Sequence, residues 1–257
     1  MMIEEVQFRI DELNSMKKYP KELFYLGNKE LLNRKKVSLI GTRRPSSYTK
    51  LQTAKISSEL SKRGICIVSG AAMGVDSIAH QNAGANNTIA IMANGLDIKY
   101  PNVNKSIITK IENEGLTLSQ FKVGFKATPW SFVLRNEIVV SLGEILIVSE
   151  ADLKSGSMRS VEYALKMGKK IYVLPHRLGE SEGTNYLLKN NLATSIYDID
   201  EFVSQFGSIQ YLEKDDFLEY CKTNPTYDEA IKKYPQRVFE CELSGIIEIK
   251  NSKIILV

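Results

Sequence analysis

The sequence predicts an α/β protein: a parallel sheet with helices on both faces, followed by a small separate C-terminal domain. Short apolar runs alternate with helical patterns of about 10–15 residues, as in βαβ units. These runs, among them VSLI, ICIV and ILIV, are continuously apolar. Continuous apolar runs are typical of strands buried on both faces of a parallel sheet. Small and polar residues follow the strand ends, where open α/β sheets form their ligand crevice.

The main domain is expected at residues 37–207, and residues 1–36 form a charged lead-in packed on it. Its strands are expected at Val37–Ile40, Ile65–Val68, Thr88–Ala93, Gly115–Ser119, Glu144–Ser149 and Lys170–Leu174. Its helices are expected at Thr49–Lys62, from Val75 onward, at about 104–113, and at Phe132–Leu142, Ser155–Met167, Gly183–Asn191 and Ile196–Phe206. The inward face of the first helix is predicted to consist of Leu51, Ala54, Ile56 and Leu60.

Residues 212–257 are predicted to form the small C-terminal domain. Helices are expected at Asp216–Lys222, Tyr227–Lys233 and Gln236–Leu243, followed by a hairpin in IIEIKNSKIILV. Three helices and a hairpin follow the order of a winged helix. This segment has seven basic and nine acidic residues, so its net charge is −2. Because DNA affinity depends on positive charge, we expect this domain mainly to contact protein.

Composition narrows the class of protein. The net charge of +4 over 257 residues permits nucleic-acid binding without indicating it. The cysteines Cys66, Cys221 and Cys241 are far apart and form no CxxC pair. Disulfides and zinc are therefore not expected, in keeping with a cytoplasmic protein. No secretion signal and no apolar run long enough to span a membrane is visible.

The crevice is expected to attract an anion. Arg43 and Arg44 lie in the turn after the first strand. The turn Ser69–Gly74 precedes a helix, and its Gly70 and Gly74 allow a ligand to come close. Another helix opens with Ser155, Gly156 and Ser157, whose hydroxyls and N–H groups suit a phosphate. The alternative is that the turns are tight connections that bind nothing.

Catalysis is not predicted. The two histidines, His80 and His176, have no partner pattern, and no GxSxG, HExxH or P-loop motif is present. Asp76 is expected to cap its helix, and Glu150 to orient the loop after its strand. Without a nucleophile–base pair or a metal-ligand set, a binding protein is favoured over an enzyme.

Basic and aromatic residues lie together near the start of the fourth helix. Arg135 and Asn136 follow Trp130 and Phe132 closely, a combination that suits single-stranded nucleic acid. The alternative is that both aromatic side chains belong to the core.

Several segments, in order, resemble the DNA-processing protein A family (DprA, also called Smf) over about residues 19–206. They are IGTRRP at Ile40–Pro45, SGAAMGVDSIAH at Ser69–His80, NGLDIKYPNVN at Asn94–Asn104, FVLRNEI at Phe132–Ile138, SEADLKSGSMRSVEYAL at Ser149–Leu165, GKKIYVLP at Gly168–Pro175 and GTNYLLKNN at Gly183–Asn191. The chain departs from the family pattern at Val133, where the family usually has proline, and at Glu137, where it has arginine.

The resemblance implies an extended Rossmann-like domain that binds and protects incoming single-stranded DNA. It further implies a homodimer that helps load a RecA-type recombinase in natural transformation, with no nucleotide cofactor. On this interpretation Arg43 contacts phosphate, the turns at Ser69–Gly74 and Ser155–Ser157 face the DNA backbone, Phe132 stacks on a base and Lys169 closes the pocket. The segment FECELSGIIEI resembles the family's winged-helix domain.

A second interpretation is an enzyme. Cytokinin-activating phosphoribohydrolases carry a PGGxGTxxE motif where this chain has SGSMRSVEYA, so Glu162 could stand for the motif's glutamate. The glycine pair and the GT are missing, which makes that match poor.

Overall fold

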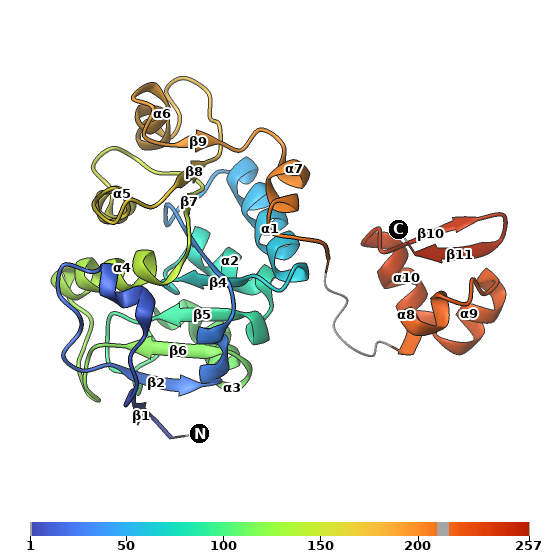
Figure 1. The fold of residues 1–257 in the computed structure, drawn as a ribbon, viewed down its shortest axis with the longest axis horizontal. Coiled ribbons are helices and arrows are strands. Elements are labelled where there is room, and N and C mark those ends of the chain that lie inside the picture. Colours follow the sequence, from blue (N-terminus) through green and yellow to red (C-terminus); the bar gives the residue numbers. More distant parts are fainter. Residues whose placement is uncertain (1, 210–215, 257) are drawn as a thin grey trace. The chain divides into compact units, whose positions relative to one another are not determined.

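The structure is a computed structural model that describes residues 2–209 and 216–256. The chain divides into two compact units, Met1–Ile209 and Gln210–Val257 (Figure 1). The predicted start of the C-terminal domain, at residues 212–215, lies outside the described residues. No helix in the described part of the chain is long and apolar enough to cross a membrane.

Within the described residues of the larger unit, nine strands form one sheet in the order β1-β2-β6-β5-β4-β3-β7-β8-β9. The strands are β1 (Glu4–Glu5), β2 (Phe24–Gly27), β3 (Lys36–Ile40), β4 (Cys66–Ser69), β5 (Thr88–Ile91), β6 (Leu116–Ser119), β7 (Leu146–Val148), β8 (Ile171–Val173) and β9 (Thr194–Ser195). The seven strands from β3 to β9 all pair parallel with one another. The chain builds one half of the sheet from β3 through β6, and then returns to β7 on the other side of β3.

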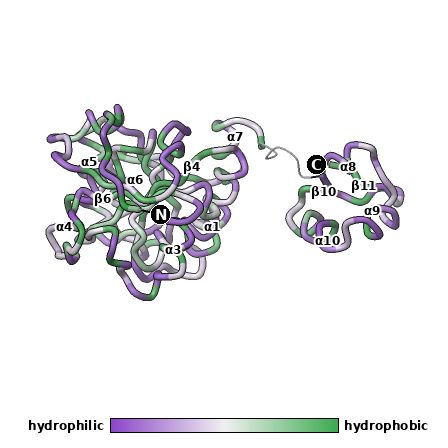
Figure 2. Tube along the Cα trace, turned by 90° about the horizontal axis from the view of Figure 1, so that it is seen from below, coloured by the Kyte–Doolittle hydropathy of each residue, from purple (hydrophilic) through white to green (hydrophobic). Residues whose placement is uncertain are grey.

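Helices cover both faces of this sheet, which confirms the predicted α/β fold class. They are α1 (Ser47–Lys62), α2 (Val75–Ala83), α3 (Lys105–Glu114), α4 (Pro129–Leu142), α5 (Gly156–Lys166), α6 (Glu182–Lys189) and α7 (Ile199–Ser204). Apolar residues of α1, α2 and α7 share one core cluster with Val37 and Leu39 of β3. Residues of α4 and α5 share another with Ile40. In Figure 2 the hydrophobic stretches concentrate in the middle of this unit, around β4 and β6.

The lead-in does more than pack on the main domain. Its β2 pairs antiparallel with β6, with Phe24 opposite Ser119, and β1 pairs antiparallel with β2. Between them a 3-10 helix, Asp11–Ser15, buries Leu13 completely. Residues 1–36 therefore extend the parallel sheet by two antiparallel strands.

The packed face of α1 differs from the prediction. Leu51 was expected to point inward, and its side chain is 67% exposed. The buried residues of α1 are Thr49, Thr53, Ile56, Ser57 and Leu60. The serine and threonine hydroxyls of this face have hydrogen-bond acceptors in the interior. Ser57 Oγ donates to the Ala79 carbonyl at 2.6 Å, and Thr53 Oγ1 donates to Ser149 Oγ at 2.9 Å. Because these hydroxyls are hydrogen-bonded, small polar residues can be buried on the packed face of α1 where a leucine was predicted.

The described part of the smaller unit has the order predicted for a winged helix. It contains the helices α8 (Asp216–Cys221), α9 (Tyr227–Lys233) and α10 (Pro235–Leu243), and the hairpin of β10 (Ile247–Lys250) and β11 (Lys253–Leu256). Phe217, Val238 and Ile254 lie in its core, so residues from the first helix, the third helix and the hairpin pack together.

Candidate nucleic-acid interface

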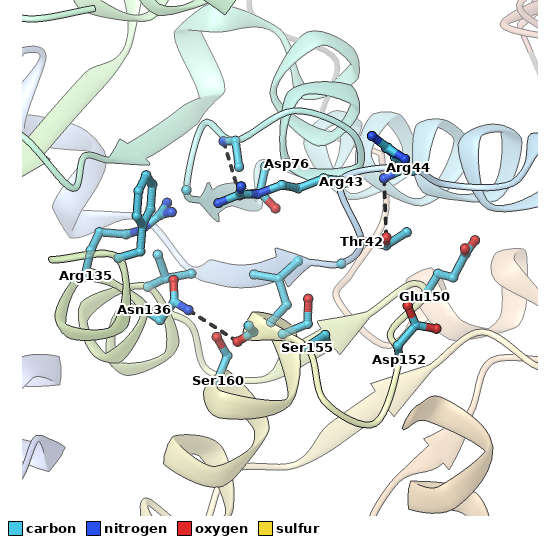
Figure 3. Close-up of a pocket in the computed structure, with 18 residues that line it drawn as sticks. Thr42, Arg43, Arg44, Asp76, Arg135, Asn136, Glu150, Asp152, Ser155 and Ser160 are labelled. Atoms are coloured by element: carbon cyan, nitrogen blue, oxygen red, sulfur yellow. Dashed lines mark hydrogen bonds between the residues drawn. The ribbon is translucent and has the colours of Figure 1, made fainter. Parts of the chain in front are cut away.

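A cavity of about 460 Å³ lies where β3 and β7 end. These two strands are neighbours in the sheet, and the chain order reverses between them. Such a switch point leaves room between the loops that follow the two strands, which is where open α/β sheets bind ligands. The cavity is lined by the loops after β3 and β7, the turn after β4, and the facing parts of α4 and α5 (Figure 3). Its size suits a ligand of the size of a nucleotide.

The loop after β3 brings two arginines to the cavity. Arg43 and Arg44 are both exposed, and both line the cavity wall. The loop is fixed because Thr42 N donates to the Glu150 carbonyl at 2.8 Å, which joins the ends of β3 and β7. Arg43 Cζ lies 5.4 Å from the centroid of the Phe132 ring, within cation–π range. The Arg43 guanidinium is thus held on an aromatic surface while it stays accessible to an anion.

Gly74 supports this loop from below. It has φ +82°, and a Cβ there would lie 2.4 Å from the Thr42 carbonyl oxygen. Only glycine accommodates both the left-handed backbone and the close approach of the arginine loop. Gly74 itself is not among the residues that line the cavity. The prediction that it contacts the ligand is therefore corrected to a supporting role.

Arg135 forms the floor of the cavity. Its side chain is 3% exposed, and its Nη1 donates to the Ile91 carbonyl at 3.0 Å. The guanidinium fills the space over Gly70, where a Cβ would lie only 1.5 Å from Nη1. Gly70 thus leaves room for arginine rather than for a ligand backbone. Arg135 Nε is buried and has no hydrogen-bond partner among the described residues.

Asp76 is the acidic residue that interacts electrostatically with Arg135. Burial raises the pKa of Asp76, and the Arg135 guanidinium opposes that rise. Burial likewise lowers the pKa of Arg135, and Asp76 opposes that shift. The Asp76 carboxylate also accepts a hydrogen bond from Ala72 N at 3.3 Å. Predicted as a helix cap, Asp76 instead lies in the cavity wall and offsets a buried positive charge.

The N-terminus of α5 forms the opposite wall. Ser155 is its N-cap and accepts a hydrogen bond from Met158 N at 3.4 Å, while Gly156 and Ser157 begin the first turn. Asn136 of α4 donates to the Gly156 carbonyl at 3.4 Å and so connects the two helices (Figure 3). The free N–H groups and the helix dipole of this turn favour a negatively charged group.

The cavity is not uniformly positive. Among the described residues, its lining holds the carboxylates Asp76, Glu150 and Asp152 beside three arginines. Asp76 offsets Arg135. Glu150 Oε2 accepts from both the backbone N–H and the hydroxyl of Ser46 at 3.0 Å, so it holds the segment after β3 and not, as predicted, the loop after its own strand. The accessible positive charge is therefore that of Arg43 and Arg44 at the rim.

The structure gathers most of the predicted site residues and excludes three. The predicted residues that line the cavity are Arg43, Arg44, Gly70, Phe132, Arg135, Asn136, Ser155, Gly156 and Ser157. Ser69 is fully buried, donates its hydroxyl to the Leu39 carbonyl at 2.6 Å and is not among the residues that line the cavity. Sequence reasoning missed the cavity-lining residues Thr42, Asp152 and Ser160. Asp152 carries a usable signal, because it lies in the loop that follows the buried strand β7.

Lys169 lies away from the cavity. Its ammonium donates to the carbonyls of Ser141 and Gly143 at the C-terminal end of α4. Burial lowers the Lys169 pKa to about 8. The residue precedes β8, whereas the cavity lies at the edge where the parallel strands end. The prediction that Lys169 closes the pocket is corrected. Lys169 donates hydrogen bonds to carbonyls at the end of α4 that have no partner within the helix.

Glu137 explains one departure from the family pattern. It is buried on α4, and its Oε1 accepts a hydrogen bond from Lys17 N at 3.0 Å. The carboxylate thus attaches the lead-in segment to α4. Neither Glu137 nor Val133 lines the cavity.

The histidines have structural contacts. His80 Nδ1 lies 2.6 Å from the hydroxyl of Thr88, and burial lowers the His80 pKa to about 3, so this ring is neutral near pH 7. His176 Nε2 lies 2.8 Å from the Ser149 carbonyl, to which it donates. Among the described residues no three His, Cys, Asp or Glu side chains are placed to hold a metal ion.

Comparison with known proteins decides the family. The model of the family described as DNA recombination-mediator protein A matches residues 3–207. The chain belongs to this family. The resemblance seen in the sequence over about residues 19–206 is thereby confirmed, and the match extends into the lead-in.

Relatives of the DprA/Smf family are similar over most of this chain. DNA processing protein DprA of Streptococcus pneumoniae is 35% identical over 196 residues, 73% of this chain and 68% of that protein. Protein Smf of Synechocystis is 34% identical over 76% of this chain and 51% of that protein. The chain thus spans about half the length of the Synechocystis relative.

Solved structures of the DprA/Smf family share the fold. The structure of DNA processing protein A from Helicobacter pylori, which concerns its single-stranded DNA-binding mode, has a TM-score of 0.78 and 41% identity. It matches 79% of this chain and 94% of that chain. The pneumococcal DprA structure has a TM-score of 0.71 and 32% identity, over 77% of this chain and 70% of that chain.

Proposed function

We propose that this protein binds and protects single-stranded DNA in the cavity between the ends of β3 and β7. The observation that carries the proposal is the exposed Arg43, held over the Phe132 ring and facing the N-terminus of α5. A phosphate between these two walls would meet a guanidinium and free N–H groups, and a base would meet an aromatic ring. The single-stranded DNA binding described for the H. pylori relative supports this assignment.

The wider role follows from family membership. We propose a recombination mediator that helps load a RecA-type recombinase in natural transformation, acting as a cytoplasmic homodimer. The family's description as a recombination mediator supports the first part.

A binding role is favoured over the phosphoribohydrolase alternative. Glu162, the residue that would represent the enzyme's glutamate, is half exposed on α5 and pairs with Arg159 at 3.2 Å. It is not among the residues that line the cavity. No observation on the described residues supplies a nucleophile–base pair, so we propose that the protein is not an enzyme.

Titration of the full chain with a labelled single strand and the matching duplex, over a series of salt concentrations, tests the proposal. We expect tighter binding of the single strand, because its bases are free to stack, and an affinity that falls as salt rises. The proposal is wrong if the duplex binds as tightly as the single strand, or if neither binds at low salt.

The smaller unit is proposed to contact protein. Its α10, in the position of a recognition helix, exposes Phe239 and Leu243, and its Arg237 is paired with Glu240 at 2.6 Å. Such a surface offers little charge for phosphates.

Truncation after Ile209 tests this second assignment, because the two compact units divide there. We expect the fragment to keep most of the single-strand affinity, measured beside the full chain at the same salt. A loss of roughly tenfold or more, about 1.4 kcal/mol, from a fragment that remains folded would identify the smaller unit as a DNA-binding element.

A further inference from the structure

An exposed tyrosine lies beside the cavity. The Tyr100 side chain is 47% exposed, and its ring centroid is 6.1 Å from that of Phe132, with the ring planes inclined by 52°. Phe132 lines the cavity, whereas Tyr100 is not among the lining residues. The two rings therefore form a short aromatic track from the cavity to the surface outside it.

The segment that carries Tyr100 is anchored on both sides. On one side, the buried side chain of Asn104 donates to the carbonyls of Ala71 and Ala72 at 3.0 Å each. These carbonyls belong to the turn after β4, and Ala72 itself lines the cavity. On the other side, Lys99 Nζ lies 2.9 Å from Oε2 of Glu112, a buried residue of α3. Tyr100 is thus held at a fixed position relative to the cavity wall.

This combination points to a ligand. A single exposed aromatic side chain is ordinary on a protein surface. Tyr100 differs because its neighbour is an aromatic residue of the binding cavity, and because its segment is anchored to that cavity. A fixed aromatic ring loses little conformational entropy when a flat ligand stacks on it. Bases of a single strand are such ligands, and every base has a face that can stack.

We propose that Tyr100 stacks on a base of the single strand where the strand leaves the cavity past Phe132. This inference rests on the proposed function, because it assigns the path of the same DNA. Tyr100 then adds affinity only for strands long enough to extend beyond the cavity. Since stacking involves no charge, its contribution is independent of salt.

Oligothymidines of increasing length, titrated against the full chain by fluorescence anisotropy, test this inference. Tyr100→Ala should bind the longer strands about five- to tenfold more weakly, the low end of the range for one stacked base. For the shortest oligothymidine that the wild type still binds, the affinity of Tyr100→Ala should equal that of the wild type. Tyr100→Phe should match the wild type at every length, because it keeps the ring.

Tyr186→Ala is the matched control. Tyr186 is also 47% exposed, and it lies on α6, outside the lining of the cavity. This variant should bind every strand as the wild type does. The salt dependence of Tyr100→Ala should equal that of the wild type, unlike a variant that loses a phosphate contact. Equal melting temperatures would show that the Tyr100 variants remain folded.

The outcomes separate this inference from the proposed function. If Tyr100→Ala equals the wild type at all lengths while Arg43→Ala binds weakly, the stacking position is wrong and the DNA site stands. An equal loss at every length, or a loss in Tyr100→Phe, also contradicts the inference. If the wild type binds no single strand, the proposed function fails and this inference fails with it.

Discussion

Arg135→Ala should lower the free energy of unfolding of the larger unit by about 3–5 kcal/mol, the cost of removing one partner of a buried charge pair. The variant leaves the buried Asp76 without the guanidinium that favours its ionised form. It also removes the hydrogen bond to the Ile91 carbonyl and opens a void over Gly70. Urea unfolding followed by tryptophan fluorescence measures this loss, because the only tryptophan, Trp130, lies in this unit.

The pH dependence of the same variant gives a second readout. The pKa of Asp76 is raised in the folded state, so the folded protein holds this proton more tightly than the unfolded chain. The contribution of Asp76 to stability therefore falls as the pH rises from about 4 through its folded-state pKa. Without Arg135 the pKa rises further. The stability difference between wild type and variant should thus grow as the pH rises through the folded-state pKa of Asp76 in the wild type, because only the variant still holds the proton there.

Asp76→Asn in the Arg135→Ala background provides the control. Neutralising Asp76 should restore part of the lost stability and reduce the dependence of the variant on pH, because the uncompensated charge is gone. Two findings would contradict a buried charge pair. One is an Arg135→Ala protein that unfolds at the wild-type urea concentration, and the other is a stability difference that does not change with pH.

The sequence predicted the parallel half of this fold because its signals are local. Continuous apolar runs marked β3, β4 and β7, and the structure places each within two residues of the expected position. Residues after parallel strands must meet at one edge of the sheet, so a ligand crevice at this edge could be predicted, whereas the adjacency of β3 and β7 that forms the cavity comes from the structure. Arg43 and Ser155 come together there although they are far apart in the sequence.

Other features depend on contacts that a single sequence does not display. The strands β1 and β2 are short and charged or mixed in character, and they exist because β6 offers an open edge. Leu51 was assigned inward on hydrophobicity alone, whereas serine and threonine hydroxyls with partners in the core form the packed face of α1.

The three corrected site residues differ from the prediction for two physical reasons, the direction of a position within its turn and the edge of the sheet on which it lies. Ser69 and Gly74 belong to the correct turn. The Ser69 side chain, however, points back to β3, and Gly74 contacts the backbone of the loop that carries Arg43. Lys169 was assigned through the family resemblance, although a residue before a parallel strand lies at the edge opposite the cavity. Arg135 was expected to contact nucleic acid, and its burial becomes visible only with Gly70 next to its guanidinium and Asp76 nearby.

Arg43→Ala is the variant with the largest effect expected on DNA binding. The exposed guanidinium of Arg43 is held over Phe132 at the rim of the cavity, where a phosphate can reach it. A hydrogen bond to a charged group contributes about 1.5–3 kcal/mol. Single-strand affinity should therefore fall roughly 10- to 150-fold, while stability stays close to that of the wild type because the side chain is exposed.

Arg63→Ala is a suitable control for this variant. Arg63 follows the last residue of α1, pairs with Glu59 at 2.8 Å, and is not among the residues that line the cavity. Removing its charge changes the net charge of the protein by the same amount as Arg43→Ala does. A loss of affinity shared by both variants would reflect the overall charge, whereas a loss confined to Arg43→Ala would locate the phosphate at the rim.

The salt dependence of single-strand binding by Arg43→Ala, measured beside the wild type and Arg63→Ala, tests the central assignment most directly. If Arg43 neutralises one phosphate, the slope of log affinity against log salt should be smaller by about 0.7 in Arg43→Ala and unchanged in Arg63→Ala. A slope and an affinity in Arg43→Ala that both equal those of the wild type would contradict the placement of single-stranded DNA in this cavity.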